Sequence, residues 1–265
     1  EESGEVYGIN LVYSSSFSAS VQLDMYRSAR VQIGLNPENF SWELRPGEHF
    51  VTPEVVMIYS HEGLGGMSRR FHRIYRERLC RGIYRDKARP ILLNTWEAAY
   101  FQIDYATVMR YAEVAKELGV ELIVVDDGWF GERNNEFTSL GDWEVNTRKF
   151  PGGFSRLAEE LKALGLGLGI WVEPEMISPN SKLYHEHPDW CIHAEGTMRT
   201  EWRNQLVLDL SRSEIVDYVI AKLTALLKSA EISYVKWDCN RRLTECGSVW
   251  LGKERQKEFW HRYML

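Results

Sequence analysis

The sequence predicts an α/β protein in which antiparallel β structure precedes a barrel of parallel strands and helices. Three observations lead to this class. Short runs of alternating apolar and polar residues fill about the first 60 positions, strands that are apolar on both faces alternate with helices after Pro90, and polar and aromatic residues recur where these strands end. Apolar strands that alternate with helices are typical of a parallel sheet covered by helices.

The N-terminal strands come first. Alternating runs cover Val6–Tyr13, Ala29–Leu35 and Val55–Tyr59, and turn-forming residues separate them at Asn36–Asn39 and Arg45–Glu48. This pattern predicts antiparallel β structure, with at least four strands in one sheet. Four strands are too few to close a sandwich.

A helix follows, and then a boundary. From Gly66 to about Arg81 the apolar residues form one stripe at helical spacing. The charged segment Arg85–Pro90 ends in proline. We therefore expect two domains, spanning residues 1–88 and 89–265.

Beyond Pro90 the pattern alternates between strands and helices. The helix at Ser211–Glu214 begins with a Ser-x-x-Glu sequence, in which each side chain caps a free backbone N–H of the other. Glycines after two of the helices tolerate the positive φ of a helix end. In chain order the expected elements are strand Ile91–Trp96, helix Asp104–Leu118 ended by Gly119, strand Val120–Asp126, helix Ser155–Leu164 ended by Gly165, strand Leu166–Val172, an extended run Leu206–Leu210, a helix from Ser211 and strand Ile232–Trp237.

A barrel and a doubly wound sheet both fit this alternation. The turn after the first strand, Asn94–Tyr100, has no glycine-rich phosphate loop and no Walker lysine, which counts against a nucleotide-binding sheet. A barrel enzyme instead builds its site from residues at the ends of several strands. The stretch from Pro90 to Leu265 is shorter than the about 250 residues of a closed barrel. We expect a (β/α)8-type TIM barrel of which only about the first half is present.

Composition excludes several classes of function. The net charge of −6, with both signs interspersed, gives no basic surface for nucleic acid or an anionic membrane. No apolar run approaches the roughly 20 residues of a membrane span, and residues 1–5 do not resemble a signal peptide. The four cysteines show no C-x-x-C spacing, so we expect reduced thiols in a cytoplasmic protein.

The strand ends carry the candidate chemistry. Converging carboxylates repel one another unless a metal, a cation or a hydroxylated ligand offsets them. A metal would use Asp126, Glu173 and Asp238, a sugar would use carboxylates and indole faces, and a phosphate finds few cations. Four tryptophans next to the acidic positions favour the sugar over the metal. These residues are Trp96, Trp129, Trp171 and Trp237, and a further carboxylate, Asp209, ends the run Leu206–Leu210.

Hydrolysis of a glycosidic bond needs two carboxyl groups, one of them a nucleophile or base. Asp238 is the best candidate for the nucleophile. Lys236, two residues earlier, lies on the same face of its strand, and its positive charge lowers the carboxylate pKa.

The motifs as a set resemble the bacterial α-galactosidases of glycoside hydrolase family 36. They occur in family order over about residues 90 to 245, and residues 1–88 look like the end of the β-sandwich domain of this family and its helical connection to the barrel. The motifs are Leu93–Ala98, Val125–Phe130, Gly141–Trp143, Gly169–Met176 and Lys236–Asn240.

The resemblance implies roles for individual residues. Asp238 would be the nucleophile, and Asp126 and Asp127 would bind galactose hydroxyls including O4. Asn240 would face the 2-hydroxyl. The same pocket would be lined by Trp96, Trp171, Arg203 and Lys236. The resemblance also implies retention of configuration, galactosides such as melibiose and raffinose as substrates, no metal or organic cofactor, and a cytoplasmic homotetramer.

The acid/base of the family is an aspartate on a later strand, beyond Leu265. We therefore expect a fragment of an α-galactosidase that lacks its acid/base. Two alternatives stay open: a non-catalytic galactoside-binding fragment, and a related α-N-acetylgalactosaminidase or galactosyl-transferring enzyme. A metal-dependent lyase or isomerase is a more distant one.

Overall fold

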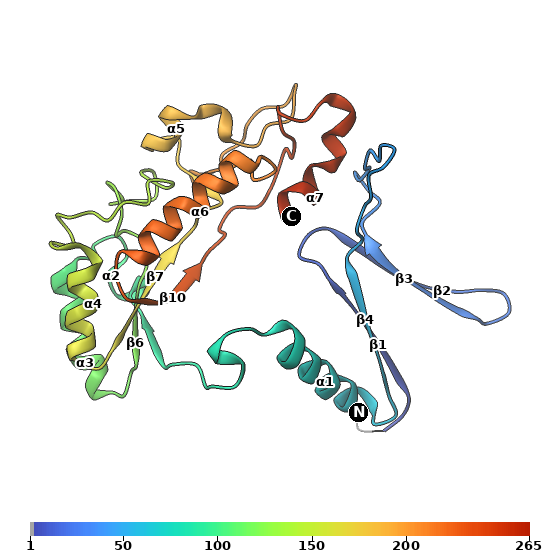
Figure 1. Cartoon of the computed structure of the whole chain (residues 1–265), viewed down its shortest axis with the longest axis horizontal. Helices are drawn as coiled ribbons and strands as arrows, with labels where there is room; N and C mark the ends of the chain where they lie inside the picture. The colour runs from blue at the N-terminus through green and yellow to red at the C-terminus, as the bar shows by residue number, and fades with distance from the viewer. Residues whose placement is uncertain (1–2) are drawn as a thin grey trace. The chain divides into compact units, whose positions relative to one another are not determined.

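The computed structural model describes residues 3–265 and contains two compact units (Figure 1). One unit extends to Arg89, and the other runs from Pro90 to Tyr263. No helix in residues 3–265 is long and apolar enough to cross a membrane. The four cysteines are free thiols, as expected.

The first unit contains two separate antiparallel strand pairs and a helix. The antiparallel strands are confirmed, but the expected single sheet is wrong. Every residue of β2 is exposed, and no strand pairing joins β2–β3 to the other pair. The elements are β1 (Val6–Val12) paired with β4 (Glu54–Ser60), β2 (Phe17–Leu23) paired with β3 (Ala29–Leu35), α1 (Gly63–Ile74), the π-helical turn η1 (Tyr75–Leu79) and the 3₁₀ turn η2 (Ile83–Arg85).

Helix α1 packs against β1 at a glycine. A Cβ added at Gly8 would lie 2.6 Å from both Met67 Sδ and Phe71 Cε2. Only glycine therefore allows the helix to approach the strand this closely.

The second unit is built on a four-stranded parallel sheet. Its strands are β5 (Leu92–Asn94), β6 (Leu122–Val125), β7 (Gly167–Val172) and β10 (Ile232–Trp237), and their spatial order is also their chain order. All neighbours are parallel. The four strands expected from the sequence are confirmed, and their carboxyl ends consequently lie along one edge of the sheet.

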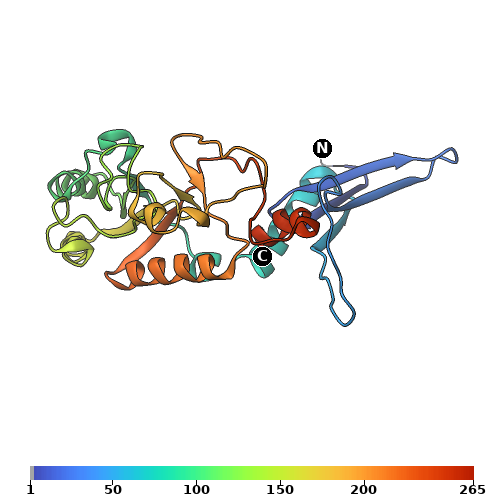
Figure 2. The ribbon, with the colours of Figure 1, turned by 90° about the horizontal axis from the view of Figure 1, so that it is seen from above.

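Three long helices connect these strands. They are α3 (Tyr105–Glu117), α4 (Gly153–Ala163) and α6 (Ser213–Lys228). Figure 1 shows α3 and α4 side by side, and Figure 2 shows α6, in orange, along its length. As expected, Gly119 and Gly165 follow the ends of α3 and α4 with φ of +79° and +81°. The shorter helical elements are α2 (Trp96–Ala99), α5 (Lys182–Glu186), η3 (Pro188–Trp190), η4 (Lys253–Glu258) and α7 (Phe259–Met264).

The expected capping box at the start of α6 is wrong. The N-cap residue is Arg212, whose side chain makes no capping bond. The Ser211 hydroxyl donates to Asp209 instead, and Glu214 accepts from the Arg212 guanidinium. A charged acceptor makes the stronger hydrogen bond, so the buried Asp209 carboxylate outcompetes the backbone for Ser211.

The extended run at Leu206–Leu210 lies outside the parallel sheet. Its strand β9 (Leu206–Val207) pairs antiparallel with β8 (Met176–Ile177). Asp209 is consequently not at the carboxyl end of a parallel strand, contrary to expectation, and its second oxygen accepts from the Ser248 hydroxyl.

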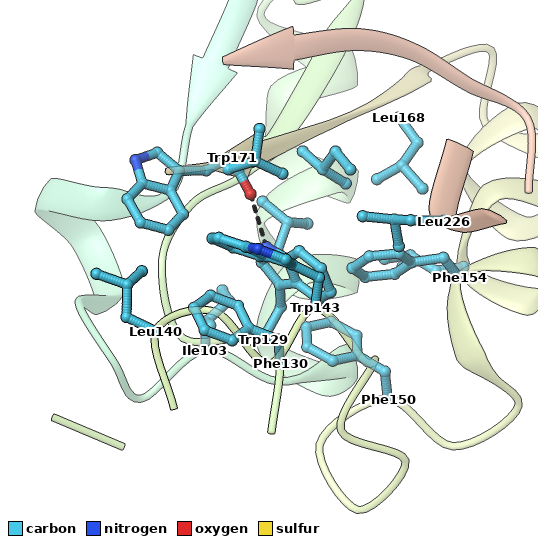
Figure 3. Close-up of a cluster of buried hydrophobic side chains, with 14 of the residues drawn as sticks. Ile103, Trp129, Phe130, Leu140, Trp143, Phe150, Phe154, Leu168, Trp171 and Leu226 are labelled. Atoms are coloured by element: carbon cyan, nitrogen blue, oxygen red, sulfur yellow. Dashed lines mark hydrogen bonds between the residues drawn. The ribbon is translucent and has the colours of Figure 1, made fainter. Parts of the chain in front are cut away.

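The core of the second unit is rich in aromatic side chains (Figure 3). Trp129 is fully buried among Phe130, Trp143 and Phe154, with ring centroids 5.0 to 6.2 Å apart. Its indole N–H donates to the Trp171 carbonyl at 2.9 Å. Trp129 therefore belongs to the core and is not available as a platform for a sugar.

Candidate active site

Asp126 follows β6 and is the centre of a hydrogen-bonded cluster. The Lys236 ammonium donates to its Oδ2 at 2.7 Å, and Asn94 Nδ2 donates to the same oxygen at 2.6 Å. The Asp127 N–H donates to Oδ1 at 2.9 Å. A carboxylate has about four acceptor positions, so Asp126 keeps capacity for one more donor.

Asp127 forms a buried, bidentate ion pair with Arg133. Nε lies 3.0 Å from Oδ1, and Nη2 lies 2.9 Å from Oδ2. The two side chains are only 8% and 2% exposed. Burial raises the pKa of Asp127 above its usual value, while the guanidinium opposes that shift. Arg133 also lies over the Phe101 ring at 5.3 Å, which holds it in place.

Replacing Arg133 by methionine is expected to destabilise the protein by about 3 to 5 kcal/mol, because a buried carboxylate loses its partner. The pKa of Asp127 is higher in the folded protein than in the unfolded chain. Ionisation of Asp127 therefore lowers the free energy of unfolding as the pH rises above its unfolded-state pKa. The loss should therefore be larger at pH 8 than at pH 5. Urea unfolding at both values measures it.

Arg148→Met is the matched control, since Arg148 pairs with Glu132 on the surface. Exposed pairs contribute little, so no measurable change is expected. Equal stability of Arg133→Met and Arg148→Met at pH 8 would show that the Asp127 pair is not the buried support described above.

Asp238 lies just beyond β10, hydrogen-bonded to the end of β7. Its N–H donates to Val172 O at 2.8 Å. Its carboxylate accepts from Trp171 Nε1 at 2.9 Å, from Asn240 Nδ2 at 2.7 Å and from the Cys239 N–H at 3.1 Å.

The carboxyl group of Asp238 is held in its ionised form. Burial alone raises its pKa, but the donors on Trp171, Asn240 and Cys239, with the charge of Lys236, lower it below the usual value. The effect expected of Lys236 is present, yet it is smaller than those of the three hydrogen bonds. The ammonium itself pairs with Asp126. The resulting group is a half-buried carboxylate, fixed in orientation and charged.

Arg203 and Asn240 are joined to this group. Arg203 Nη1 donates to Asn240 Oδ1 at 2.8 Å, and Asn240 in turn donates to Asp238. The chain from Arg203 through Asn240 to Asp238 thus brings together three of the residues expected in the pocket.

The tryptophans separate into different roles. Trp171 is buried, stacks on Phe130 at 6.2 Å and donates to Asp238, so it orients the carboxylate. Trp96 is half-buried and packs edge-on against neighbouring aromatic rings. The backbone N–H of Trp96 donates to Asn94 Oδ1, and the Asn94 side chain in turn donates to Asp126. Trp237 is 53% exposed and donates to Glu175, on the other face of β10 from Lys236.

Glu173 directly follows β7 and has no exposed surface. Its oxygens accept from the Asn240 N–H and, at 3.0 Å, from Gln205 Nε2. Burial raises the pKa of Glu173 to about 7, and the negative charge of Asp238 acts in the same direction. Among residues 3–265 no three His, Cys, Asp or Glu side chains form a group suited to a metal ion.

Sequence reasoning missed three of these contact residues. Asn94 belongs to one of the motifs, but the sequence indicates no role of its own for it. The sequence likewise does not identify Arg133 and Gln205 as partners of a carboxylate. Arg133 lies in the polar loop Gly131–Asn135, which resembles any solvated loop. A signal was available for Asn94 alone, since it ends a parallel strand beside the one that precedes Asp126.

Two family models cover nearly the whole chain. The melibiase model matches residues 49–265. The model of the glycosyl hydrolase family 36 N-terminal domain matches residues 1–45.

Curated relatives match the chain from end to end. The α-galactosidase AgaA of Geobacillus stearothermophilus is 56% identical over 265 residues, and α-galactosidase 1 of Pediococcus pentosaceus is 44% identical over 265 residues. Each match covers 100% of this chain and 36% of the relative. The chain therefore spans little more than a third of the length of these relatives.

Solved structures agree with the sequence matches. The crystal structure of AgaA from G. stearothermophilus superposes with a TM-score of 0.96 at 55% identity, covering 100% of this chain and 37% of that one. The α-galactosidase from Lactobacillus brevis superposes with a TM-score of 0.96 at 42% identity, covering 99% of this chain and 35% of that one. An AgaA variant in complex with raffinose superposes with a TM-score of 0.96 at 55% identity, covering 100% of this chain and 37% of that one. The chain belongs to the melibiase family and, with its N-terminal segment, to glycoside hydrolase family 36.

Proposed function

We propose that this chain is part of a retaining α-galactosidase in which Asp238 attacks the anomeric carbon. The observation that carries the proposal is the Asp238 carboxylate, which three hydrogen bonds keep ionised and fixed in orientation. A retaining glycosidase needs such a nucleophile, because the reaction passes through a covalent glycosyl-enzyme. The α-galactosidase relatives and the neighbour solved with raffinose support the substrate class.

The pocket for galactose would form between the ends of β5, β6 and β10. Asp126 and Asp127 would accept hydrogen bonds from sugar hydroxyls, using acceptor positions that Lys236 and Arg133 leave free. Asn240 would face the 2-hydroxyl. The other pocket residues would be Trp96, Trp171, Arg203 and Lys236.

The wider architecture is part of the same proposal. The strands β5, β6, β7 and β10, parallel and in chain order, would be the first half of a (β/α)8 barrel, and residues 1–88 the end of a β-sandwich domain with its helical linker. The enzyme would be the longer protein to which this chain contributes about a third, and its general acid would lie outside these residues. We further propose a homotetramer in the cytoplasm that acts on melibiose- and raffinose-type sugars without a metal or cofactor.

The recognition step is tested with galactose and glucose. The full-length enzyme is expected to release galactose from raffinose with the α configuration, and Asp126→Ala to weaken galactose binding at least tenfold. A charge-assisted hydrogen bond left unpaired in a buried site costs about 1.5 to 3 kcal/mol. NMR of the first product and calorimetric titration with each sugar measure the two effects.

Asp217→Ala serves as the control, since this residue is exposed on helix α6 and is not among the residues proposed to line the pocket. It should bind galactose as the parent does. Equal affinity of the parent for glucose and galactose, or a β-configured first product, would contradict the proposal.

A further inference from the structure

We propose that Glu173 is a positioning residue that holds the nucleophile segment, Asp238–Asn240, in register with the turn Trp202–Gln205. The proposal rests on the proposed function, since it assigns Glu173 a part in the attack by Asp238. It acts through other residues and does not touch the sugar.

The two oxygens of Glu173 face two different segments. One accepts from the backbone N–H of Asn240, and the other accepts from the side-chain amide of Gln205. Asn240 donates from its own side chain to Asp238 at 2.7 Å. A displacement at Glu173 would therefore reach the nucleophile through one residue.

The turn held by Gln205 needs such an anchor. Arg203 and Asn204 adopt positive φ values of 54° and 58°, a region that non-glycine residues occupy only where their surroundings impose it. Backbone hydrogen bonds between Trp202 and Gln205, at 3.3 and 3.2 Å, close the turn. Arg203, at its apex, donates to Asn240 at 2.8 Å. The turn and the nucleophile segment thus meet twice, at Glu173 and at Asn240.

A carboxylate suits this position because it offers two acceptors and no donor. Both protein groups that approach it are N–H donors. An amide offers one acceptor and directs N–H atoms at the second donor. Gln205 has room to adapt, however, because its Oε1 is buried and has no hydrogen-bond partner among the described residues.

Burial also separates Glu173 from the reaction itself. With 0% of its surface exposed and both oxygens occupied by protein donors, Glu173 has no free face for a leaving group. Direct proton transfer requires hydrogen-bond distance to the substrate. Glu173 therefore affects the rate by positioning Asn240 and, through it, Asp238.

Glu173→Leu in the full-length enzyme tests this role. It removes both acceptors, and misplacing a catalytic group by about 1 Å costs on the order of 100-fold in rate. We expect kcat/KM for an aryl α-galactoside, whose phenol leaves without an acid, to fall about 100-fold. The dissociation constant of galactose should rise less than about tenfold, because Asp126 and Asp127 do not contact Glu173 and only the contacts of Asn240 and Arg203 with the sugar are disturbed.

Two further variants separate position from general damage. Glu175→Leu removes a carboxylate two residues away that accepts from Trp237 and Tyr263 instead, and it should leave both quantities within about threefold of the parent. Glu173→Gln should have a kcat/KM within about tenfold of that of the parent, because the Gln205 amide can turn to present its unpartnered oxygen.

A galactose affinity that falls as far as the rate, or a rate unchanged in Glu173→Leu, would overturn the proposal. If Glu173→Leu does not fold, Gln205→Leu is the deciding variant. A rate that falls about tenfold, and further than the galactose affinity, would support the proposal, and an unchanged rate would contradict it. A parent enzyme that does not cleave the aryl galactoside would instead refute the proposed function.

Discussion

In the full-length enzyme, Asp238→Ala should lower the turnover of α-galactosides by several orders of magnitude while leaving the fold and galactose binding intact. The substitution removes the atom that forms the covalent bond, and no neighbouring group can replace it, because Trp171 and Asn240 are donors toward that position. Steady-state kinetics on raffinose and on an aryl α-galactoside measures the loss.

Azide provides the decisive control for this variant. A small anion can occupy the space left by the carboxylate and attack the anomeric carbon directly, giving a galactosyl azide of inverted configuration. Partial rescue with inverted product is therefore expected. Turnover of Asp238→Ala close to that of the parent would show that another group is the nucleophile.

The isolated 265-residue chain should be inactive on raffinose and melibiose yet react once with an aryl α-galactoside. A sugar leaving group must be protonated, and the proposed acid is not in this chain, whereas an acidic phenol leaves as a stable anion. We expect a single slow burst of phenol, at most one per chain, followed by a plateau. Absorbance of the released phenol against time measures it.

The plateau has its own physical reason. The residue that protonates the leaving group also activates the water that cleaves the adduct, so without it the adduct persists. Asp238→Ala in the isolated chain is the matched control and should give no burst. Sustained turnover of raffinose by the isolated chain would show that an acid is present within it.

The parallel sheet was predictable because its strands are apolar on both faces and separated by helices. The strand Ile232–Trp237 has the expected bounds, and the glycines after α3 and α4 end those helices as expected. The pairing of β10 with β7 sets Lys236 opposite Trp171. That register explains why residues at the ends of two strands that are far apart in the sequence meet around Asp238.

The sequence-based errors arose where the expected hydrogen bond or strand pairing was replaced by another. Ser211 has the pattern of a helix cap, but the buried carboxylate of Asp209, two residues earlier in the chain, is the stronger acceptor. The run Leu206–Leu210 is as apolar as a barrel strand, and hydrophobicity alone does not distinguish the two-residue antiparallel pair that it forms.

The sequence places the acidic groups of the candidate site after strands, but it does not reveal the residues that support them. Asp126, Asp127 and Asp238 follow strands, which sequence can show. Arg133 comes from a loop whose polar composition carries no mark of a buried ion pair, and its role depends on a fold around Phe101 that no local period encodes. Trp129 was misleading because an indole beside a carboxylate looks the same in a core as in a binding site.

Mass spectrometry of the chain after the burst tests the covalent role of Asp238 most directly. The chain would be quenched in acid once phenol release reaches its plateau, then digested and mapped by fragmentation. One hexose on the peptide that contains Asp238, attached at that carboxyl group, is the expected result. A hexose on another carboxylate such as Asp126, or no adduct in a chain that binds galactose and releases phenol, would contradict it.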